Sequence, residues 1–427
     1  MLKKIKNFIK KTDRFLFEKF GSAENIKYLE NLKEAKIIFS YLNEIGNDSK
    51  VKFVGGCIRK AMCGEEIDDI DLATTLEPSE VKKRLNKNNI KVVDTGILHG
   101  TLTAIINKKK FEITTLRKDI STDGRHAEVT FTTNWQEDSQ RRDLTINSIY
   151  ADIDGQIYDP QNGISDLKNR KINFIGDPQE RIQEDYLRIL RYFRFFTQYG
   201  KKDHDKNVIK AIRQNINGIN IISNERIFDE VKKTLSLKNV YNLFSNKDSK
   251  EIILNIFPQF KFYNRLKNFN NLKEETKNKY DYKNILALLC IDETDNYEFF
   301  CYKYKLSNRI KDNFKFLSKN FKSLKNKKFY SENNIKKIIY LYNKNIVRDI
   351  LLFIKCSSDN LQDFNLENLL NYVGGCKVPE FPISGEHLKK HGFKTGEELG
   401  KKLKSLEQKW IDNNFVIDAN LSTKYLN

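Results

Sequence analysis

Hydrophobic and polar positions divide the chain into two parts with different periodicities. After a helix-like lead-in to about Ile45, short runs of β-branched and apolar residues alternate with polar positions, which is typical of half-buried strands. The runs are VKFVGG from Val51, IDDIDLATT from Ile67, IKVVDTG from Ile90, TLTAIIN from Thr101 and FEITTLR from Phe111. One helical stretch, PSEVKKRLNK from Pro78, lies among them. The pattern predicts a small sheet with covering helices.

From about Asp177 onward the apolar spacing is helical almost throughout, with breaks rich in Lys, Asn and Asp. We therefore expect an α+β chain, in which a mixed-sheet domain precedes an all-α half. The longest apolar runs, such as NILALLCI from Asn284, are shorter than the ~18 to 20 residues that span a bilayer, so no membrane helix is expected. The basic opening MLKKIKNFIKKTDRFLF is interpreted as an N-terminal helix and not as a presequence.

Composition adds a preference for nucleic acid as a partner. The 427 residues include 76 Lys and Arg against 57 Asp and Glu, a formal net charge of +19. This balance is typical of chains that meet phosphate backbones, although a compositionally biased genome explains it equally well. The six cysteines show no CxxC pair and no zinc-like spacing, so we expect reduced thiols in the cytoplasm, or in the mitochondrial matrix of a eukaryote.

Two glycines mark the first candidate for chemistry. In VGGCIRK, from Val54 to Lys60, a strand is predicted to end and a helix to begin. Gly55 and Gly56 allow backbone amides to approach an anion, the helix N-terminus adds partial positive charge, and Arg59 lies one turn further in. The segment predicts a triphosphate-binding turn. Taken alone, an ordinary tight turn is the commoner explanation.

Acidic residues follow on the predicted strands. Asp69 and Asp71 are two apart on one strand and therefore face the same side of the pleat, whereas Asp68 points the other way. Glu112 lies among apolar residues of a later strand, where an acid without a cation would be costly. Paired carboxylates suit Mg²⁺, so these three residues form a candidate metal site. A lone pair of acids is more often surface acidity.

A second charged constellation comes from RRDLTINS, which begins at Arg141, and from RIQEDYLRILRYFRF, which begins at Arg181. On one continuous helix, the second segment places a set of charged residues on one arc and apolar residues opposite. The arc consists of Arg181, Glu184, Asp185, Arg188 and Arg191. The alternative is a solvated face with ion pairs, since Glu184 and Arg188 are four residues apart.

Taken in order, these motifs resemble the class II CCA-adding enzymes, within the DNA polymerase β-like nucleotidyltransferase superfamily. The resemblance covers about residues 50 to 235. It rests on GG-x-x-R, D-x-D, FEITTLR, DGRHAEVTFTTNW, RRDLTIN, EDYLRILRYFRF and NERI, and a C-terminal segment from Phe381 is also similar to one in some members. It implies a head with an N-terminal helix over 1–165, a base-recognising neck over 166–235, a body over 236–330 and a tRNA-binding tail over 331–427.

The resemblance also implies roles for individual residues. The metal ligands would be Asp69 and Asp71, holding two Mg²⁺ ions with Glu112 as third catalytic carboxylate. Triphosphate contacts would come from Gly55, Gly56 and Arg59, with further phosphate contacts from Arg191 and Arg194. Arg142 and Asp143 would contact the nucleotide and its ribose, and Asp185 and Arg188 would read the base. Lys60 departs from the family, which usually has Asp there.

The chemistry of the base-reading pair explains a preference for C and A. Both bases present an amino donor beside an acceptor ring nitrogen, which suits one acceptor-only carboxylate and one donor-only guanidinium. Glu184 would orient Arg188, and a loop from Arg117 to Trp135 would adapt the pocket between C and A.

The expected partners are therefore tRNA, CTP and ATP, with no protein partner implied. Residues 301–330, which interleave basic and aromatic side chains, are a candidate RNA-binding stretch. His204 in KDHDK is not assigned to a metal. A poly(A) polymerase or an enzyme that adds only A remains open, and a non-catalytic RNA-binding module is the more remote alternative.

Overall fold

A computed structural model describes residues 27–43, 50–123, 126–201, 203–357 and 364–417. The predicted N-terminal helix and the end of the lead-in near Ile45 lie outside these residues. Two compact units divide the chain, one over residues 1–256 and the other over residues 257–427. The finer division into head, neck, body and tail stays a prediction.

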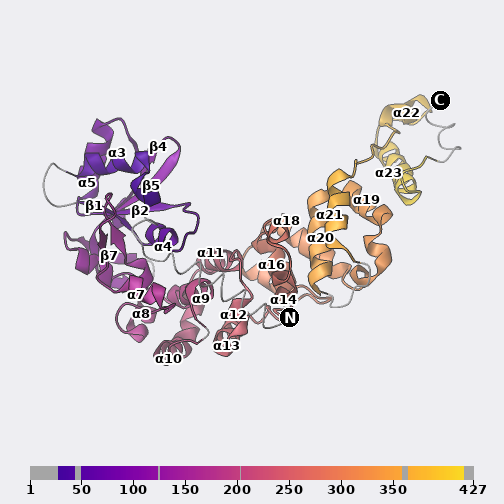
Figure 1. Ribbon diagram of the computed structural model, residues 1–427. Helices are drawn as coiled ribbons and strands as arrows, with labels where there is room; N and C mark the ends of the chain where they lie inside the picture. The colour runs from indigo at the N-terminus through magenta and orange to yellow at the C-terminus, as the bar shows by residue number, and fades with distance from the viewer. Residues whose placement is uncertain (1–26, 44–49, 124–125, 202, 358–363, 418–427) are drawn as a thin grey trace. The chain divides into compact units, whose positions relative to one another are not determined.

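The first unit contains the sheet that the alternating segments predict (Figure 1). Seven strands lie in the order β3-β4-β5-β2-β1-β8-β9, and β2 with β5 is the parallel pair, so the sheet is mixed. The strands are β1 Val51–Val54, β2 Ile70–Thr74, β3 Lys91–Gly96, β4 Thr101–Ile106, β5 Lys109–Thr115, β8 Tyr150–Ala151 and β9 Ile157–Tyr158.

The two faces of this sheet differ in character. Phe53 and Leu72 point to a face covered by α3 (Lys33–Leu42) and α5 (Pro78–Lys87), where the Phe39 and Phe53 rings are 4.9 Å apart. Strand alternation sends Asp71 and Glu112 to the opposite face. The sequence thus builds one apolar face for the core and one face that carries acids.

The remaining helices of the first unit surround the sheet and extend beyond it (Figure 1). They are α2 Lys27–Glu30, α4 Gly56–Met62, α6 Trp135–Gln140, α7 Gly163–Lys168, α8 Pro178–Glu184, α9 Leu187–Tyr199, α10 Lys206–Asn215, α11 Asn224–Leu235, α12 Asn242–Ser245 and α13 Lys247–Ile256. Short 3-10 turns lie at Ile97–His99, Thr145–Asn147 and Ile216–Ile221.

A separate hairpin replaces the predicted long loop from Arg117 to Trp135. Strands β6 (Arg117–Asp123) and β7 (His126–Phe131) pair antiparallel with a register shift between Asp119 and Ser121. The expectation of an irregular loop was therefore wrong for the backbone. Its Thr and Val positions satisfy their backbone groups in a two-stranded ladder.

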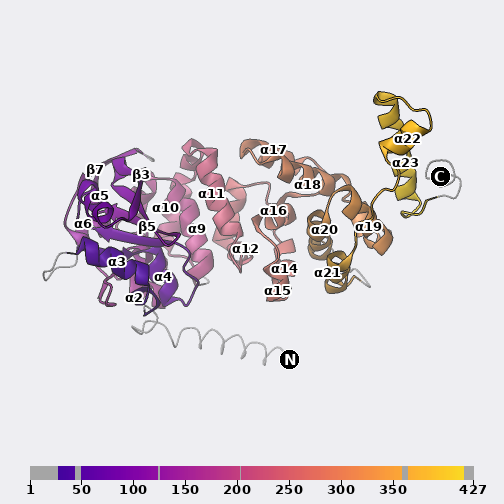
Figure 2. The same ribbon diagram turned by 90° about the horizontal axis from the view of Figure 1, so that it is seen from above.

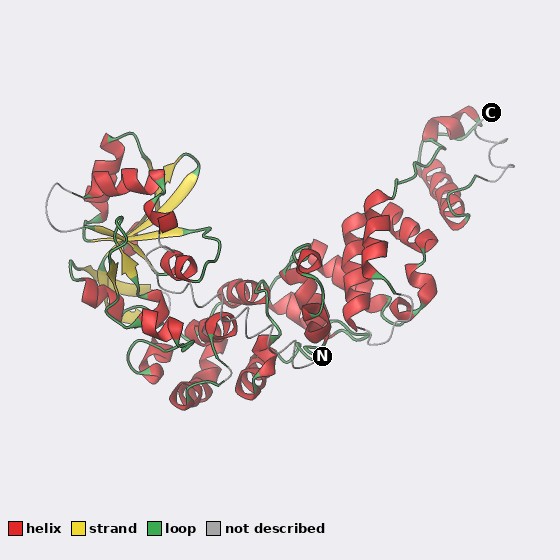
Figure 3. Ribbon diagram, viewed as in Figure 1, coloured by secondary structure: helices red, strands yellow, loops and turns green. Residues whose placement is uncertain are grey.

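The described part of the second unit is helical, as the periodicity predicts (Figure 3). Its helices are α14 Arg265–Asn270, α15 Glu274–Lys277, α16 Tyr282–Cys290, α17 Asn296–Lys303, α18 Asn308–Lys319, α19 Glu332–Leu341, α20 Lys344–Ser357, α21 Leu366–Gly375, α22 Gly385–Lys390 and α23 Glu397–Asp412, with 3-10 turns at Ser323–Lys325 and Lys327–Tyr330. Among the described residues, no helix is long and apolar enough to cross a membrane.

Candidate active site

The glycine turn lies where the sequence predicts it, between β1 and α4. Gly55 has φ +66°, a backbone conformation that residues with a Cβ rarely adopt. An added Cβ would lie 3.1 Å from the Asn147 carbonyl oxygen. At Gly56 an added Cβ would lie 3.8 Å from Oδ2 of Asp71. The two glycines therefore bring the backbone close to the carboxylate of the neighbouring strand.

Arg59 is a buried cation beside this turn, only 6% exposed. Its Nη1 donates to Oδ1 of Asn147, and its guanidinium lies 4.6 Å from the centre of the Phe195 ring. Its Nε is buried and has no hydrogen-bond partner among the described residues. Since a buried donor without a partner is costly, Arg59 is suited to an anionic ligand.

The three predicted carboxylates lie on two neighbouring strands or directly before one of them. Asp71 and Glu112 are register partners on β2 and β5, and Asp69 comes one residue before β2. Burial, with Glu112 and then Asp69 contributing like charge, raises the pKa of Asp71 to about 6. A divalent cation would relieve this repulsion, so the donor set fits one.

Two details differ from the sequence-based argument for these acids. Glu112 and Asp69 are exposed, because the apolar neighbours Phe111 and Ile113 point to the other face of the sheet. The costly burial expected of Glu112 was therefore wrong, although its alignment with Asp71 holds. Within the described ranges, no group of three or more Asp, Glu, His or Cys is close enough to hold a metal ion by itself. That geometry is compatible with Mg²⁺, which takes one or two carboxylates together with substrate phosphates.

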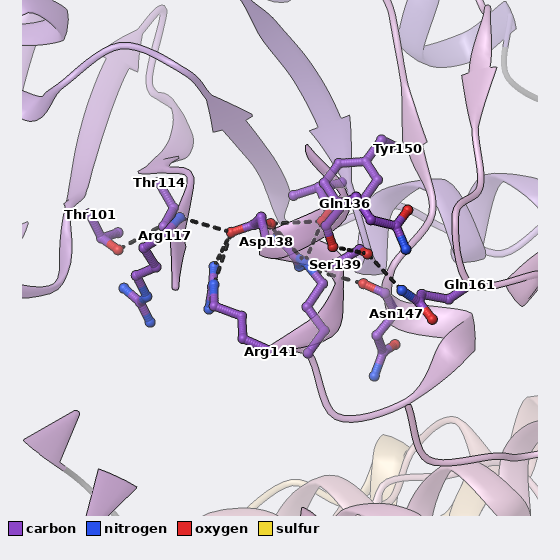
Figure 4. A network of polar contacts seen from close by, with 12 residues as sticks. Thr101, Thr114, Arg117, Gln136, Asp138, Ser139, Arg141, Asn147, Tyr150 and Gln161 are labelled. Carbon is purple, nitrogen blue, oxygen red and sulfur yellow. Dashed lines mark hydrogen bonds and ion pairs between the residues drawn. The ribbon is translucent and has the colours of Figure 1, made fainter. Parts of the chain in front are cut away.

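Asp138 organises the arginines opposite the glycine turn (Figure 4). This fully buried carboxylate accepts hydrogen bonds from Arg142 Nη2 at 3.1 Å, Arg141 Nε at 2.9 Å and the Tyr150 hydroxyl at 2.7 Å. It also accepts from the backbone N–H of Arg117, at the base of the hairpin, at 3.3 Å. The two arginines hold the pKa of Asp138 well below its usual range. The network fixes Arg142 and links it to the hairpin.

Asp143 and the arginines of α9 form a second group. The Oδ2 of Asp143 accepts from Arg191 at 2.6 Å, and Oδ1 accepts from Nδ2 of Asn147 at 2.9 Å. The Arg191 charge lowers the pKa of Asp143. Arg194, predicted as a phosphate contact, instead pairs with the buried carboxylate of Glu230. Its role as a phosphate contact stays a prediction.

The predicted continuous helix from Arg181 to Phe195 is broken at Asp185, so that expectation was wrong. Helix α8 ends at Glu184, Asp185 is extended, and its Oδ1 accepts from the Leu187 N–H at 3.1 Å. A short acidic side chain that bonds nearby backbone competes with helix formation, which explains the break.

The contacts on either side of this break orient the base-reading pair. Glu184 pairs with both Arg181 and Arg188, and Arg188 Nη1 also donates to the Arg181 carbonyl at 2.8 Å. Oδ2 of Asp185 accepts from Arg226 at 2.7 Å. Arg226 belongs to the NERI motif at Asn224, but sequence reasoning assigned it no contact.

One cavity of about 380 Å³ gathers most of these side chains. Nine of the residues predicted for the site line this cavity: Gly55, Gly56, Arg59, Asp71, Arg142, Asp143, Asp185, Arg188 and Arg191. Asp69, Glu112, Glu184 and Arg194 do not line it. Arg141, Asn147 and Phe195 line it and were not predicted; the Arg141 and Asn147 positions within RRDLTIN were the available signal.

Lys60, the departure from the family pattern, contacts Asp68 through its ammonium group. Asp68 also accepts a hydrogen bond from the Asp69 N–H at 3.0 Å. The ion pair between Lys60 and Asp68 thus connects α4 to the segment that carries the predicted metal ligands. Asp68 lies two residues before β2, outside the strand on which the sequence placed it, so its expected orientation away from Asp71 stays a prediction.

Two family models match the chain. The Poly A polymerase head domain matches residues 51–173, and the Probable RNA and SrmB- binding site of polymerase A matches residues 204–263. A nucleotidyltransferase head with carboxylates and arginines around one cavity is the class of protein that this fold and site define.

Relatives match over nearly the whole chain. The mitochondrial CCA tRNA nucleotidyltransferase 1 of Mus musculus is 33% identical over 97% of this chain and 94% of the relative. The CCA-adding enzyme of Lactobacillus helveticus is 30% identical over 88% of this chain and 92% of the relative. The chain belongs to the family of CCA-adding enzymes.

Solved structures share the fold at low sequence identity. The Bacillus stearothermophilus CCA-adding enzyme in complex with CTP has a TM-score of 0.67 at 22% identity, covering 89% of this chain and 93% of that chain. The Thermotoga maritima CCA-adding enzyme complexed with tRNA has a TM-score of 0.61 at 18% identity, covering 97% of both chains. The α+β architecture expected from the sequence is thereby confirmed.

Proposed function

We propose that this enzyme adds CCA to the 3′ end of tRNA, with CTP and ATP as substrates and without a nucleic-acid template. Relatives named for CCA addition, which this chain matches over most of their length, support this activity. The observation that carries the proposal is that Asp185 and Arg188 line the same cavity as Gly55, Gly56 and Asp71. One bound nucleotide therefore lies within reach of the acid and of the base-reading pair.

Enzymes of this class generally depend on metal ions, and we assign two Mg²⁺ ions to Asp69 and Asp71, with Glu112 as the third carboxylate. Burial, together with the like charges of Glu112 and Asp69, raises the pKa of Asp71 to about 6, which supports a cation there. Such ions, when bound, lower the pKa of the attacking hydroxyl and neutralise charge on the leaving pyrophosphate.

The protein's own residues hold the nucleotide for an in-line displacement. The 3′ hydroxyl of the RNA loses its proton to solvent, and its oxygen forms a bond to the α-phosphorus. The bond from the α-phosphorus to the oxygen that bridges it to the β-phosphorus breaks, and pyrophosphate leaves. Arg59, with an unsatisfied buried Nε, and Arg142, held by Asp138, supply positive charge for the triphosphate. Asp143 and Arg191, which form an ion pair with each other, also line this cavity.

Base choice follows from the hydrogen-bonding capacity left on Asp185 and Arg188. Asp185 accepts two hydrogen bonds in the structure, so its carboxylate retains lone pairs for an amino donor. Arg188 uses only Nη1, and its Nε and Nη2 have no partner in the part of the chain that the structure describes. Cytosine and adenine satisfy both groups, whereas uracil and guanine leave them mispaired.

The assignment of Asp71 is tested by Asp71→Asn, with Asp68→Asn as a control that removes a neighbouring acid. Asp71→Asn should abolish nucleotide addition and leave tRNA affinity nearly unchanged, because it removes charge at the reacting centre only. Asp68→Asn should retain activity. Single-turnover addition of labelled CTP, with tRNA binding measured in parallel, gives both readouts. Turnover of Asp71→Asn within about tenfold of wild type would contradict the metal assignment.

A further inference from the structure

The second unit contains a cavity of about 330 Å³ that has no part in the site described above. Its walls come from the first turns of α16, α18 and α20 and from the segment that precedes α16. These three helices group together in both views (Figures 1 and 2). Segments up to 70 residues apart, from Lys279 to Asp349, therefore converge on one hollow.

Positive charge dominates the rim of this cavity. Lys279, Lys283, Arg309 and Arg348 line it, and all are exposed. Lys283 pairs with Asp281 at 2.9 Å. Over the described ranges, the other three cations form no ion pair with a carboxylate. Cations without partners around a concave surface are suited to phosphate.

The N-terminal ends of α16 and α18 also face this cavity, but only the end of α18 is left without a side-chain cap. Asp281 caps α16 with a full capping box, so that end is already satisfied by a carboxylate of the chain. Ser307 precedes α18, but its side chain makes no capping hydrogen bond. The N–H groups of Ile310 and Lys311 donate to the Ser307 carbonyl, so the N–H groups of Asn308 and Arg309 are the ones left to an outside acceptor, and the 12-residue helix favours an anion at this end.

The floor of the cavity has the opposite chemistry. Asp349 accepts from Nδ2 of Asn284 at 2.6 Å and from Nδ2 of Asn313 at 2.9 Å. Its carboxylate has capacity for further donors. The Oδ1 of Asn313 is buried and has no hydrogen-bond partner among the described residues. The floor therefore presents acceptors, which bind hydroxyl or amino groups and not a dense cluster of phosphate charge.

We propose that this cavity binds one nucleotide of the RNA substrate, with its phosphodiester between Arg309 and Arg348 and a ribose hydroxyl or base amino group on Asp349. The inference rests on the proposed function, which makes tRNA the substrate. A single phosphodiester with hydroxyl donors matches cations at the rim and acceptors at the floor. A free triphosphate would place several negative charges against Asp349, which disfavours it.

The test uses the full chain with Arg309→Ala/Arg348→Ala. Its control, Lys273→Ala/Lys277→Ala, removes the same charge from residues of the same unit that are paired with Glu367 and Glu274 and lie outside the candidate RNA-binding stretch. Loss of the contacts to this one phosphodiester should weaken tRNA binding by about tenfold at low salt and reduce the slope of log affinity against log salt by roughly 0.7 to 0.9. The KM for tRNA should rise, with kcat and the KM for CTP unchanged. The control should show neither change.

Two further arms separate the possible outcomes. The inference is overturned if wild type extends tRNA but the arginine variant keeps the wild-type salt slope and KM for tRNA. If wild type extends no tRNA, the proposed function fails instead. Calorimetric titration with CTP and with pyrophosphate should give the same number of sites in both proteins. A site lost in the arginine variant would assign the cavity to free phosphates and overturn the RNA assignment.

Asp349→Asn, checked for folding by thermal melting, addresses the floor. Because Asp349 is proposed to accept a donor from RNA, this variant should bind tRNA more weakly even though a negative charge is removed. Tighter binding would overturn the role given to Asp349.

Discussion

The Arg188 guanidinium is bound through Nη1, which contacts the Glu184 carboxylate and donates to the carbonyl of Arg181. Its substitution by Ala should reduce CTP and ATP incorporation, because the acceptor ring nitrogen of C or A loses its donor. Each charge-assisted hydrogen bond to the base contributes on the order of 1.5 to 3 kcal/mol. The preference for CTP and ATP over UTP and GTP should therefore fall by about tenfold or more. Arg213→Ala, which removes an exposed arginine paired with Asp248 and Glu251, is the matched control.

Initial rates with all four NTPs, on tRNA shortened before each of the last three positions, measure this specificity. An Arg188 variant that keeps the wild-type preference for C and A would show that Arg188 and Glu184 form only a solvated ion pair.

Positions set by local spacing could be located from the sequence, whereas contacts between distant segments could not. The short spacings in VGGCIRK and DDIDL put Gly55 at a turn and Asp71 on a strand, and both line the cavity of the first unit, while their roles there stay predictions. Phe195, Asn147 and Arg226 were missed as site residues. Each reaches its partner from a segment tens of residues away, as Arg226 reaches Asp185, and no periodicity records such contacts.

At the scale of elements, strands β1 to β5 and helix α5 lie close to their predicted ranges, since alternation and an N-terminal Pro specify them. Strands β8 and β9, with two residues each, are too short to leave a pattern. The hairpin β6–β7 was read as loop because its polar residues conceal the alternation. The break between α8 and α9 depends on one side-chain hydrogen bond, from the Leu187 N–H to Asp185, which sequence periodicity does not register.

His204, in the connection between α9 and α10, gives a prediction about stability and pH. Its ring stacks on Phe196 at 3.6 Å, and its two nitrogens contact the Tyr192 hydroxyl and the Ser249 hydroxyl. Burial lowers the pKa of His204 to about 4, so the folded state keeps it neutral. The unfolded chain takes up this proton below about pH 6.5.

Stability from His204 is therefore present above about pH 6.5 and is lost as the pH falls towards 4, by about 2 kcal/mol after allowance for its partial exposure. Urea unfolding at pH 7.5 and pH 4.5 should show a smaller pH-dependent loss in His204→Gln than in wild type. The exposed His391 provides the control variant His391→Gln. Equal losses in wild type and His204→Gln would contradict the account.

At the scale of the whole molecule, the two units carry different chemistry. The first unit holds the glycine turn, the acids and the base-reading pair around one cavity, and the second unit offers a cationic cavity proposed for the RNA strand. The sequence predicted the α+β fold class, because its periodicity changes from alternating to helical near Asp177, but that change lies within the first unit and does not mark the division after Ile256. It did not locate the second cavity, since Arg309 and Arg348 meet there only through helix packing.

The most direct test of the central claim is extension of tRNA that lacks its last three nucleotides, with CTP and ATP supplied together and each NTP supplied alone, followed by sequencing of the product ends. The account predicts that the mixture yields CCA ends and no longer tails. CTP alone should give two added C residues, and UTP or GTP should give almost none. Addition of A alone, a long poly(A) tail or no extension would contradict it.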